Sequence, residues 1–85
     1  MIVVTSKSFD KKFKKLSKKI QLQAKERISL FTENPFSVIL NNHMLHGDQK
    51  MLRSINVNAD IRIVYEKVDD TTVRFLEIDT HSNLY

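Results

Sequence analysis

The side chains best suited to proton transfer are three histidines in the second half of the chain, because imidazole titrates near neutral pH. His81 lies beyond the last expected strand, in Thr80-His-Ser-Asn-Leu-Tyr85, where it can donate or accept a proton. A metal site built from histidines and Asp60 has only weak support, because two of the three fall in an expected loop. A surface or capping role is the alternative for each histidine: His43, His46 and His81.

Three arginines, Arg53, Arg62 and Arg74, lie in three successive expected strands. Arg62 and Arg74 alternate with the apolar stripes of their strands, so we expect them to meet on the open sheet face. A planar guanidinium there can clamp a phosphate. Arg53 shares the parity of the apolar residues in its strand, which indicates a structural role. Cross-strand ion pairs are the alternative, with three carboxylates as partners: Asp60, Glu66 and Glu77.

Positive charge is concentrated at the start of the chain. Residues 1–27 carry a net charge of +7 and residues 28–85 a net charge of −3, which together make the overall +4. Closely spaced lysines bind polyanions by charge contact and counterion release, so we expect an RNA-binding surface, with a solvated helix face as the alternative. The lysines concerned are Lys11, Lys12, Lys14, Lys15, Lys18 and Lys19.

The size and composition predict a single domain over residues 1–85. Of the 85 residues, 41% are hydrophobic and 28% are charged, which is typical of a compact globule. The absence of cysteine excludes disulfides, thiolate nucleophiles and zinc knuckles. No apolar run approaches the roughly 20 residues that span a bilayer, and Met1 to Val4 is too short for a signal peptide. We therefore expect no membrane association and a cytoplasmic location.

The first third of the chain has the pattern of a strand followed by helices. Ile2 to Thr5 is β-rich, and Ser8 is the expected cap of a helix whose apolar stripe is Phe9, Phe13 and Leu16. Ser17 can end this helix and cap a second one, although a single bent helix is the alternative. Pro35 ends the helical region. The stripe of the second helix is Ile20, Ala24, Ile28 and Phe31.

The remainder has the alternation of strands, which we expect over residues 52–57, 60–67 and 72–78, after a loop that includes His43. In the last strand, alternation places Ile78 on the same face as Arg74 and opposite Phe75. Asp69-Asp70 marks the turn before that strand. This order predicts an α+β fold with an N-terminal strand and two helices packed on one face of a small antiparallel sheet. The other face is then free for function.

Four motifs in the second half occur in a recognisable order. They are His43-x-Leu-x-Gly47, Arg53-Ser-Ile, Asp60-Ile-Arg-Ile-Val-Tyr65 and Thr80-His-Ser-x-Leu-Tyr85. Together they resemble the RelE/ParE toxin superfamily, most closely its RelE/StbE-like and YafQ-like branches. The resemblance is specific over residues 43–85 and generic over the helical half.

The resemblance implies a RelE-like fold and the toxin of a type II toxin–antitoxin system. Such RelE-type proteins cut mRNA in the ribosomal A site, without metal or another cofactor, by attack of a 2′-hydroxyl on its own phosphate. By position, His81 is the implied acid–base group and Arg62 the phosphate stabiliser, while His43, Asp60 and Tyr85 assist or position the substrate. The implied partners are a cognate acidic antitoxin and the ribosome with its mRNA, with the lysines and Arg74 binding RNA.

Three positions depart from the family pattern. Asn56 lies where YafQ-like toxins carry a second histidine, Ile61 where an aromatic is common, and Glu77 where some relatives carry an arginine. Two alternatives to the ribonuclease therefore stay open. One is a ParE-like toxin that binds a protein such as gyrase and cuts nothing, and the other is a catalytically degenerate homologue that keeps its antitoxin-binding surface.

Overall fold

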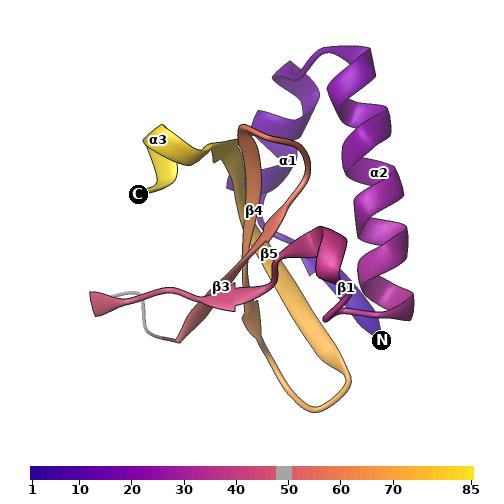
Figure 1. Cartoon of the computed structure of the whole chain (residues 1–85), viewed down its shortest axis with the longest axis vertical. Helices are drawn as coiled ribbons and strands as arrows, with labels where there is room; N and C mark the ends of the chain where they lie inside the picture. Colours follow the sequence, from indigo (N-terminus) through magenta and orange to yellow (C-terminus); the bar gives the residue numbers. More distant parts are fainter. Residues whose placement is uncertain (48–50) are drawn as a thin grey trace.

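The computed structural model describes residues 1–47 and 51–85. Its sheet has the strand order β1-β5-β4-β3-β2. Figure 1 shows α1 and α2 on one side of this sheet and the short C-terminal helix α3 on the other. The predicted α+β fold is confirmed. The elements are β1 (Ile2–Thr5), α1 (Lys7–Lys15), α2 (Lys18–Glu33), the 3-10 turn η1 (Val38–Leu40), β2 (His43–Met44), β3 (Leu52–Asn56), β4 (Ile61–Lys67), β5 (Thr72–Thr80) and α3 (His81–Leu84).

The sheet is mixed, which corrects the prediction that it is antiparallel throughout. β1 pairs in parallel with β5, with Ile2 opposite Thr72 and Thr5 opposite Phe75. The three pairings among β2, β3, β4 and β5 are antiparallel. A parallel pairing needs a long crossover, and here the whole chain between the two strands provides it. Sequence alternation alone contains no information on this direction.

Two serines define the helices. Ser6, rather than the predicted Ser8, caps α1 by accepting a hydrogen bond from Phe9 N, and Ser17 caps α2 by accepting one from Ile20 N. The predicted break at Ser17 is thus confirmed and the single bent helix is wrong. α2 ends at Glu33, directly before Asn34-Pro35, as predicted. Both apolar stripes pack into the core, through Phe9 and Phe13 on α1 and Ala24, Ile28 and Phe31 on α2.

The core lies between the two helices and one face of the sheet. On β4 the expected alternation of Arg62 with an apolar stripe is confirmed, since the stripe of Ile61, Ile63 and Tyr65 is buried in the core. On β5 the expected alternation is wrong after Phe75, because a bulge shifts the register between Val64 and Tyr65 and Ile78 then turns into the core. A bulge inserts one extra residue and reverses the alternation beyond it. Glu77 and Asp79 consequently point to the face opposite the core.

Three short elements were not predicted. The expected loop around residues 36–47 contains η1 and the two-residue strand β2, and the C-terminal segment forms one helical turn, α3. The backbone N–H of His81 donates to the carbonyl of Asp60 at 2.8 Å, which ties the start of α3 to the β3–β4 turn. α3 therefore covers part of the sheet face that the sequence left free. Among the described residues, no helix is long and apolar enough to cross a membrane.

Candidate active site

All three histidines of the chain line one hollow at the β2 edge of the sheet, His43 and His46 from one segment and His81 from another. This histidine pocket has a volume of about 410 Å³ and is formed by β2 and the residues after it together with α3. The predicted site residues His43, His81 and Tyr85 all line it. The complete lining is His43, Met44, Leu45, His46, His81 and Tyr85. Among the residues described, no three His, Asp or Glu side chains come close enough together to hold a metal ion.

His43 has a defined tautomer. Its Nδ1 lies 2.8 Å from the carbonyl oxygen of Asn41, which can only accept, so Nδ1 carries the proton. In the neutral ring, Nε2 is then an acceptor. Asn41 adopts the left-handed conformation, with φ of 46°, at the end of η1, and this turn aims its carbonyl back at the imidazole. The local backbone therefore prepares His43 to accept a proton through Nε2.

His81 and Tyr85 interact at the two ends of the C-terminal turn. Their rings are in an edge-to-face arrangement with centroids 4.7 Å apart. The turn is capped by Thr80, whose hydroxyl accepts from Asn83 N. The phenol of Tyr85 also donates a hydrogen bond to Ser54 Oγ on β3. Ser54 is fully buried, so Tyr85 is fixed to the sheet and in turn restricts the ring of His81.

Two further predicted residues, Arg62 and Asp60, lie at the β3–β4 turn, outside the lining of the histidine pocket. The guanidinium of Arg62 donates to the carbonyls of Asn58, Ile61 and Ala59 at 2.7 to 3.2 Å. Within the described residues these bonds use three of its five N–H donors. The side chain of Asp60 is exposed.

Arg62 and Arg74 do not meet, contrary to our expectation. In the sheet register Arg62 lies opposite Asp79, whereas Arg74 lies opposite Glu66 four residues further along β4, about 13 Å away. Arg74 makes an ion pair with Glu66 at 3.2 Å, the alternative that we left open. The two guanidiniums are thus held by different partners, and the structure does not bring them together as a clamp for one phosphate.

A hydrogen-bond network supports His43 from the core side. Asn42 donates to Tyr65 Oη at 2.7 Å and to the Pro35 carbonyl at 2.8 Å. It also accepts from Arg53 Nε at 2.8 Å, and the guanidinium of Arg53 lies 5.3 Å from the centre of the Phe36 ring. The structural role predicted for Arg53 is confirmed. Asn42 thus joins the turn at Pro35 to β3 and β4, immediately before His43.

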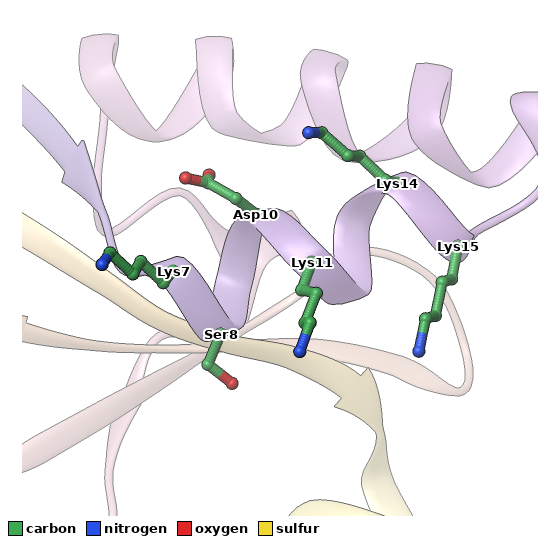
Figure 2. Close-up of a pocket in the computed structure, with 6 residues that line it drawn as sticks. All are labelled: Lys7, Ser8, Asp10, Lys11, Lys14 and Lys15. Carbon is green, nitrogen blue, oxygen red and sulfur yellow. The ribbon is translucent and has the colours of Figure 1, made fainter.

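Lysines of α1 line a second hollow, which shares no lining residue with the histidine pocket. Figure 2 shows Lys11 and Lys15 pointing the same way from α1, as expected for residues four apart. An open groove of about 760 Å³ runs along this part of the helix. Lys18 and Lys19 are exposed at the start of α2. We call the following set the lysine face: Lys7, Lys11, Lys14 and Lys15.

Lys12 departs from the other lysines. Its ammonium forms ion pairs with Glu77 at 2.8 Å and with Asp79 at 3.3 Å, both on β5. The hydrogen bond to Glu77 is the main reason that the pKa of Lys12 lies above its ordinary value. Burial raises the pKa of Glu77, but hydrogen bonds from Lys12 and Ser8 outweigh it and hold this pKa below the ordinary value. Lys12, Glu77 and Asp79 are thus all ionised at neutral pH.

The three positions that depart from the family pattern have different environments. Ile61 is a core residue of β4. Asn56 lies opposite Arg62 on the face away from the core, and its buried side-chain oxygen accepts no hydrogen bond from the described residues. Glu77 is held by Lys12 and by the hydroxyl of Ser8, which donates to it at 2.7 Å.

Sequence reasoning missed Ser54 and Asn42, which orient the two sides of the pocket. Alternation with Ile55 and Val57 puts Ser54 on the face away from the core, but nothing in the sequence signals its pairing with a residue 31 positions later. Asn42 stood in an expected loop. The local sequence signals near it are Pro35 and the preceding Asn41, a residue type that tolerates the left-handed conformation seen here.

The whole sequence, residues 1–85, matches the family described as the bacterial toxin of type II toxin–antitoxin systems, YafQ. The chain belongs to the YafQ toxin family. This match confirms the resemblance to YafQ-like toxins that the motifs of residues 43–85 indicate. It also extends that resemblance to the helical half of the chain. It also shows that the chain is the toxin of a type II system. No curated protein sequence matches it significantly.

Solved structures agree with this membership. YafQ from Escherichia coli BL21(DE3) is 25% identical, with a TM-score of 0.80 over 98% of this chain and 96% of that one. YafQ in the E. coli DinJ–YafQ toxin–antitoxin complex is 24% identical, with a TM-score of 0.77 over 98% and 94%. A YoeB/ParE toxin from Agrobacterium tumefaciens is 18% identical, with a TM-score of 0.79 over 95% and 99%, and shows the shared fold.

Proposed function

We propose that this YafQ-family toxin is an endoribonuclease that cuts mRNA on the ribosome by acid–base catalysis without a metal. The observation that carries the proposal is the histidine pocket, in which His43 and His81 come together from segments 38 residues apart. A phosphodiester with a neighbouring 2′-hydroxyl needs a base at that hydroxyl and an acid at the leaving oxygen. Two imidazoles can take these roles near neutral pH.

In the proposed reaction, His43 Nε2 accepts the proton of the 2′-hydroxyl, because Nδ1 is already bonded to the Asn41 carbonyl. The 2′-oxygen attacks its own phosphorus, and the bond to the 5′-oxygen of the next nucleotide breaks. His81, protonated, supplies a proton to that leaving oxygen. The products are a 2′,3′-cyclic phosphate and a 5′-hydroxyl. Tyr85 orients His81 through their ring contact.

Charge stabilisation comes from the turn between β3 and β4. Arg62 keeps two N–H donors beyond those given to the turn carbonyls, and these can bind a phosphate of the bound strand. Asp60, whose backbone carbonyl holds the start of α3, positions the segment that carries His81. The lysine face, with Lys18, Lys19 and Arg74, binds RNA outside the reacting phosphate, including ribosomal RNA.

A cognate antitoxin completes the proposal. The E. coli YafQ structure solved with DinJ is the relevant precedent. A chain with a net charge of +7 over its first 27 residues suits an acidic antitoxin.

Induction in a bacterial host tests this function. We expect growth arrest with new 5′ ends inside the codons of translated messages, and neither effect for His81→Ala. DNA damage without mRNA cuts would instead indicate a ParE-like target. Harmless expression of a folded wild-type protein would indicate a degenerate homologue.

A further inference from the structure

Lys12 is one of six clustered lysines in the sequence, yet its environment differs from that of the lysine face. It lies beside two carboxylates, 2.8 Å from Glu77 Oε2 and 3.3 Å from Asp79 Oδ2. Its side chain is 41% exposed, and those of its partners are 33% and 25% exposed. One cation between two anions leaves a net charge of −1, which does not attract phosphate.

The path of the chain explains how a helix residue reaches these carboxylates. β1 ends opposite Phe75, so within residues 1–47 and 51–85 no strand lies beside the edge of β5 beyond that residue. Ser6 fills the first part of this edge, donating from its N–H to the Phe75 carbonyl at 2.9 Å and from its hydroxyl to the Leu76 carbonyl at 2.7 Å. α1 follows directly, and Ser8 and Lys12 reach Glu77 from it.

Glu77 lies on the same sheet face as the histidine pocket. The register forms one continuous row of neighbours across four strands, from His43 through Ser54 and Val64 to Glu77. With strands about 4.8 Å apart, Glu77 is about 14 Å from His43 along this row. An RNA strand with one phosphate in the pocket continues beyond it. A strand that follows this row of neighbours toward β5 places its next phosphate within about 8 Å, the Debye length, of the β5 carboxylates.

We propose that Lys12 does not contact phosphate but acts as the counterion of Glu77 and Asp79. By neutralising part of their negative charge, it reduces the repulsion of RNA bound to this sheet face. The inference rests on the proposed function, because it concerns RNA bound at the histidine pocket. Without the ammonium, Glu77 and Asp79 present two uncompensated charges to the strand. The ion pairs that hold Lys12 also keep its ammonium beside the carboxylates and away from the RNA.

Binding of a fluorescent, mixed-sequence 2′-O-methyl RNA tests the inference, because this probe lacks the attacking hydroxyl and is not cut. We expect Lys12→Met to weaken binding about threefold and Lys12→Glu about tenfold at low salt. Two double variants conserve the total charge of the pair. The swap K12E/E77K and the neutral pair K12M/E77Q both return affinity to within about twofold of wild type.

A direct phosphate contact predicts the opposite outcome for the doubles. Both would then bind as weakly as the single variants at position 12, since neither has a cation there, and the inference would be wrong although the wild type binds RNA. If the folded wild type does not bind the probe at all, this inference fails, whereas the proposed function is judged separately by cleavage of mRNA on ribosomes. Thermal unfolding of every variant checks that affinities are compared among folded proteins.

Discussion

Tyr85 donates a hydrogen bond from its phenol to Ser54 Oγ, which links the last residue of the chain to the middle of β3. The ring of Tyr85 in turn contacts His81 edge to face. The proposed acid is therefore positioned by a buried serine that does not itself line the pocket.

We predict that Ser54→Ala lowers the rate of mRNA cleavage about fivefold, which corresponds to the roughly 1 kcal/mol of one hydrogen bond. The phenol of Tyr85 is half-exposed and can turn to water, so the thermal midpoint should change little. Cleavage assays on programmed ribosomes measure the rate. Ser82→Ala, on the exposed side of the same turn, is the matched control, and an equal loss in both variants would show that Ser54 has no special role.

Asn42 is the residue whose removal should loosen the other side of the pocket. We predict that Asn42→Ala lowers the free energy of unfolding by about 1 to 3 kcal/mol, because Tyr65, Arg53 and the Pro35 carbonyl all lose a partner. Urea denaturation measures this change. Asn83→Ala, which removes an exposed amide bonded to Asp79, is the control. A loss below about 0.5 kcal/mol for Asn42→Ala would contradict the claim that the hydrogen bonds of Asn42 stabilise the fold.

The carboxylates on β5 should make the fold sensitive to acid. The folded pKa of Glu77 lies below its ordinary value of 4.5, since Lys12 and Ser8 together outweigh the effect of burial. The ionised form therefore stabilises the fold above about pH 4.5, and this contribution is lost as the pH falls through the folded pKa. Asp79 acts in the same direction, because burial raises its pKa but hydrogen bonds from the Thr80 backbone, Asn83 and Lys12 outweigh burial and hold this pKa below the ordinary value.

We predict that Glu77→Gln makes the free energy of unfolding less dependent on pH below about pH 5, where the carboxylate of the wild type becomes protonated. Chemical denaturation at several pH values measures it. The control is Asp70→Asn, because the side chain of Asp70 is fully exposed in its pair with Lys67. Identical pH profiles for Glu77→Gln and wild type would contradict the assignment.

The lysine face should determine the salt dependence of RNA binding. We predict that K11Q/K14Q/K15Q reduces the slope of log affinity against log salt by about 2 on single-stranded RNA, since each phosphate contact contributes about 0.7. These side chains are exposed, so stability should be unchanged. An unaltered slope would show that the lysine face does not contact the phosphates of bound RNA.

The apolar patterns of the sequence predicted the layers of the fold because they depend on short-range periodicity. Phe9 and Phe13, Ala24 and Phe31, and Ile61 and Ile63 all take the expected places in the core. The parallel pairing of β1 and the bulge before Glu77 could not be predicted, because both depend on how distant segments align.

In the candidate active site too, contacts between distant segments could not be predicted from the sequence. Family motifs pointed to His43, His81 and Tyr85, and these three line one pocket. The roles of Ser54 and Asn42 required knowledge of their partners. Lys12 was grouped with its neighbours by composition, whereas the register of β5 places two carboxylates beside it. Composition shows how much charge a helix carries, and only the tertiary structure shows which charges are already paired.

Cleavage of one defined mRNA on purified ribosomes tests the central claim most directly. With the toxin and no added metal beyond that needed by the ribosome, we predict cuts in the A-site codon that leave a 2′,3′-cyclic phosphate and a 5′-hydroxyl. His81→Ala and His43→Ala should each lower the rate by a factor of about 100 or more. Intact mRNA with folded wild-type protein, or cutting that persists unchanged in both histidine variants, would contradict the account.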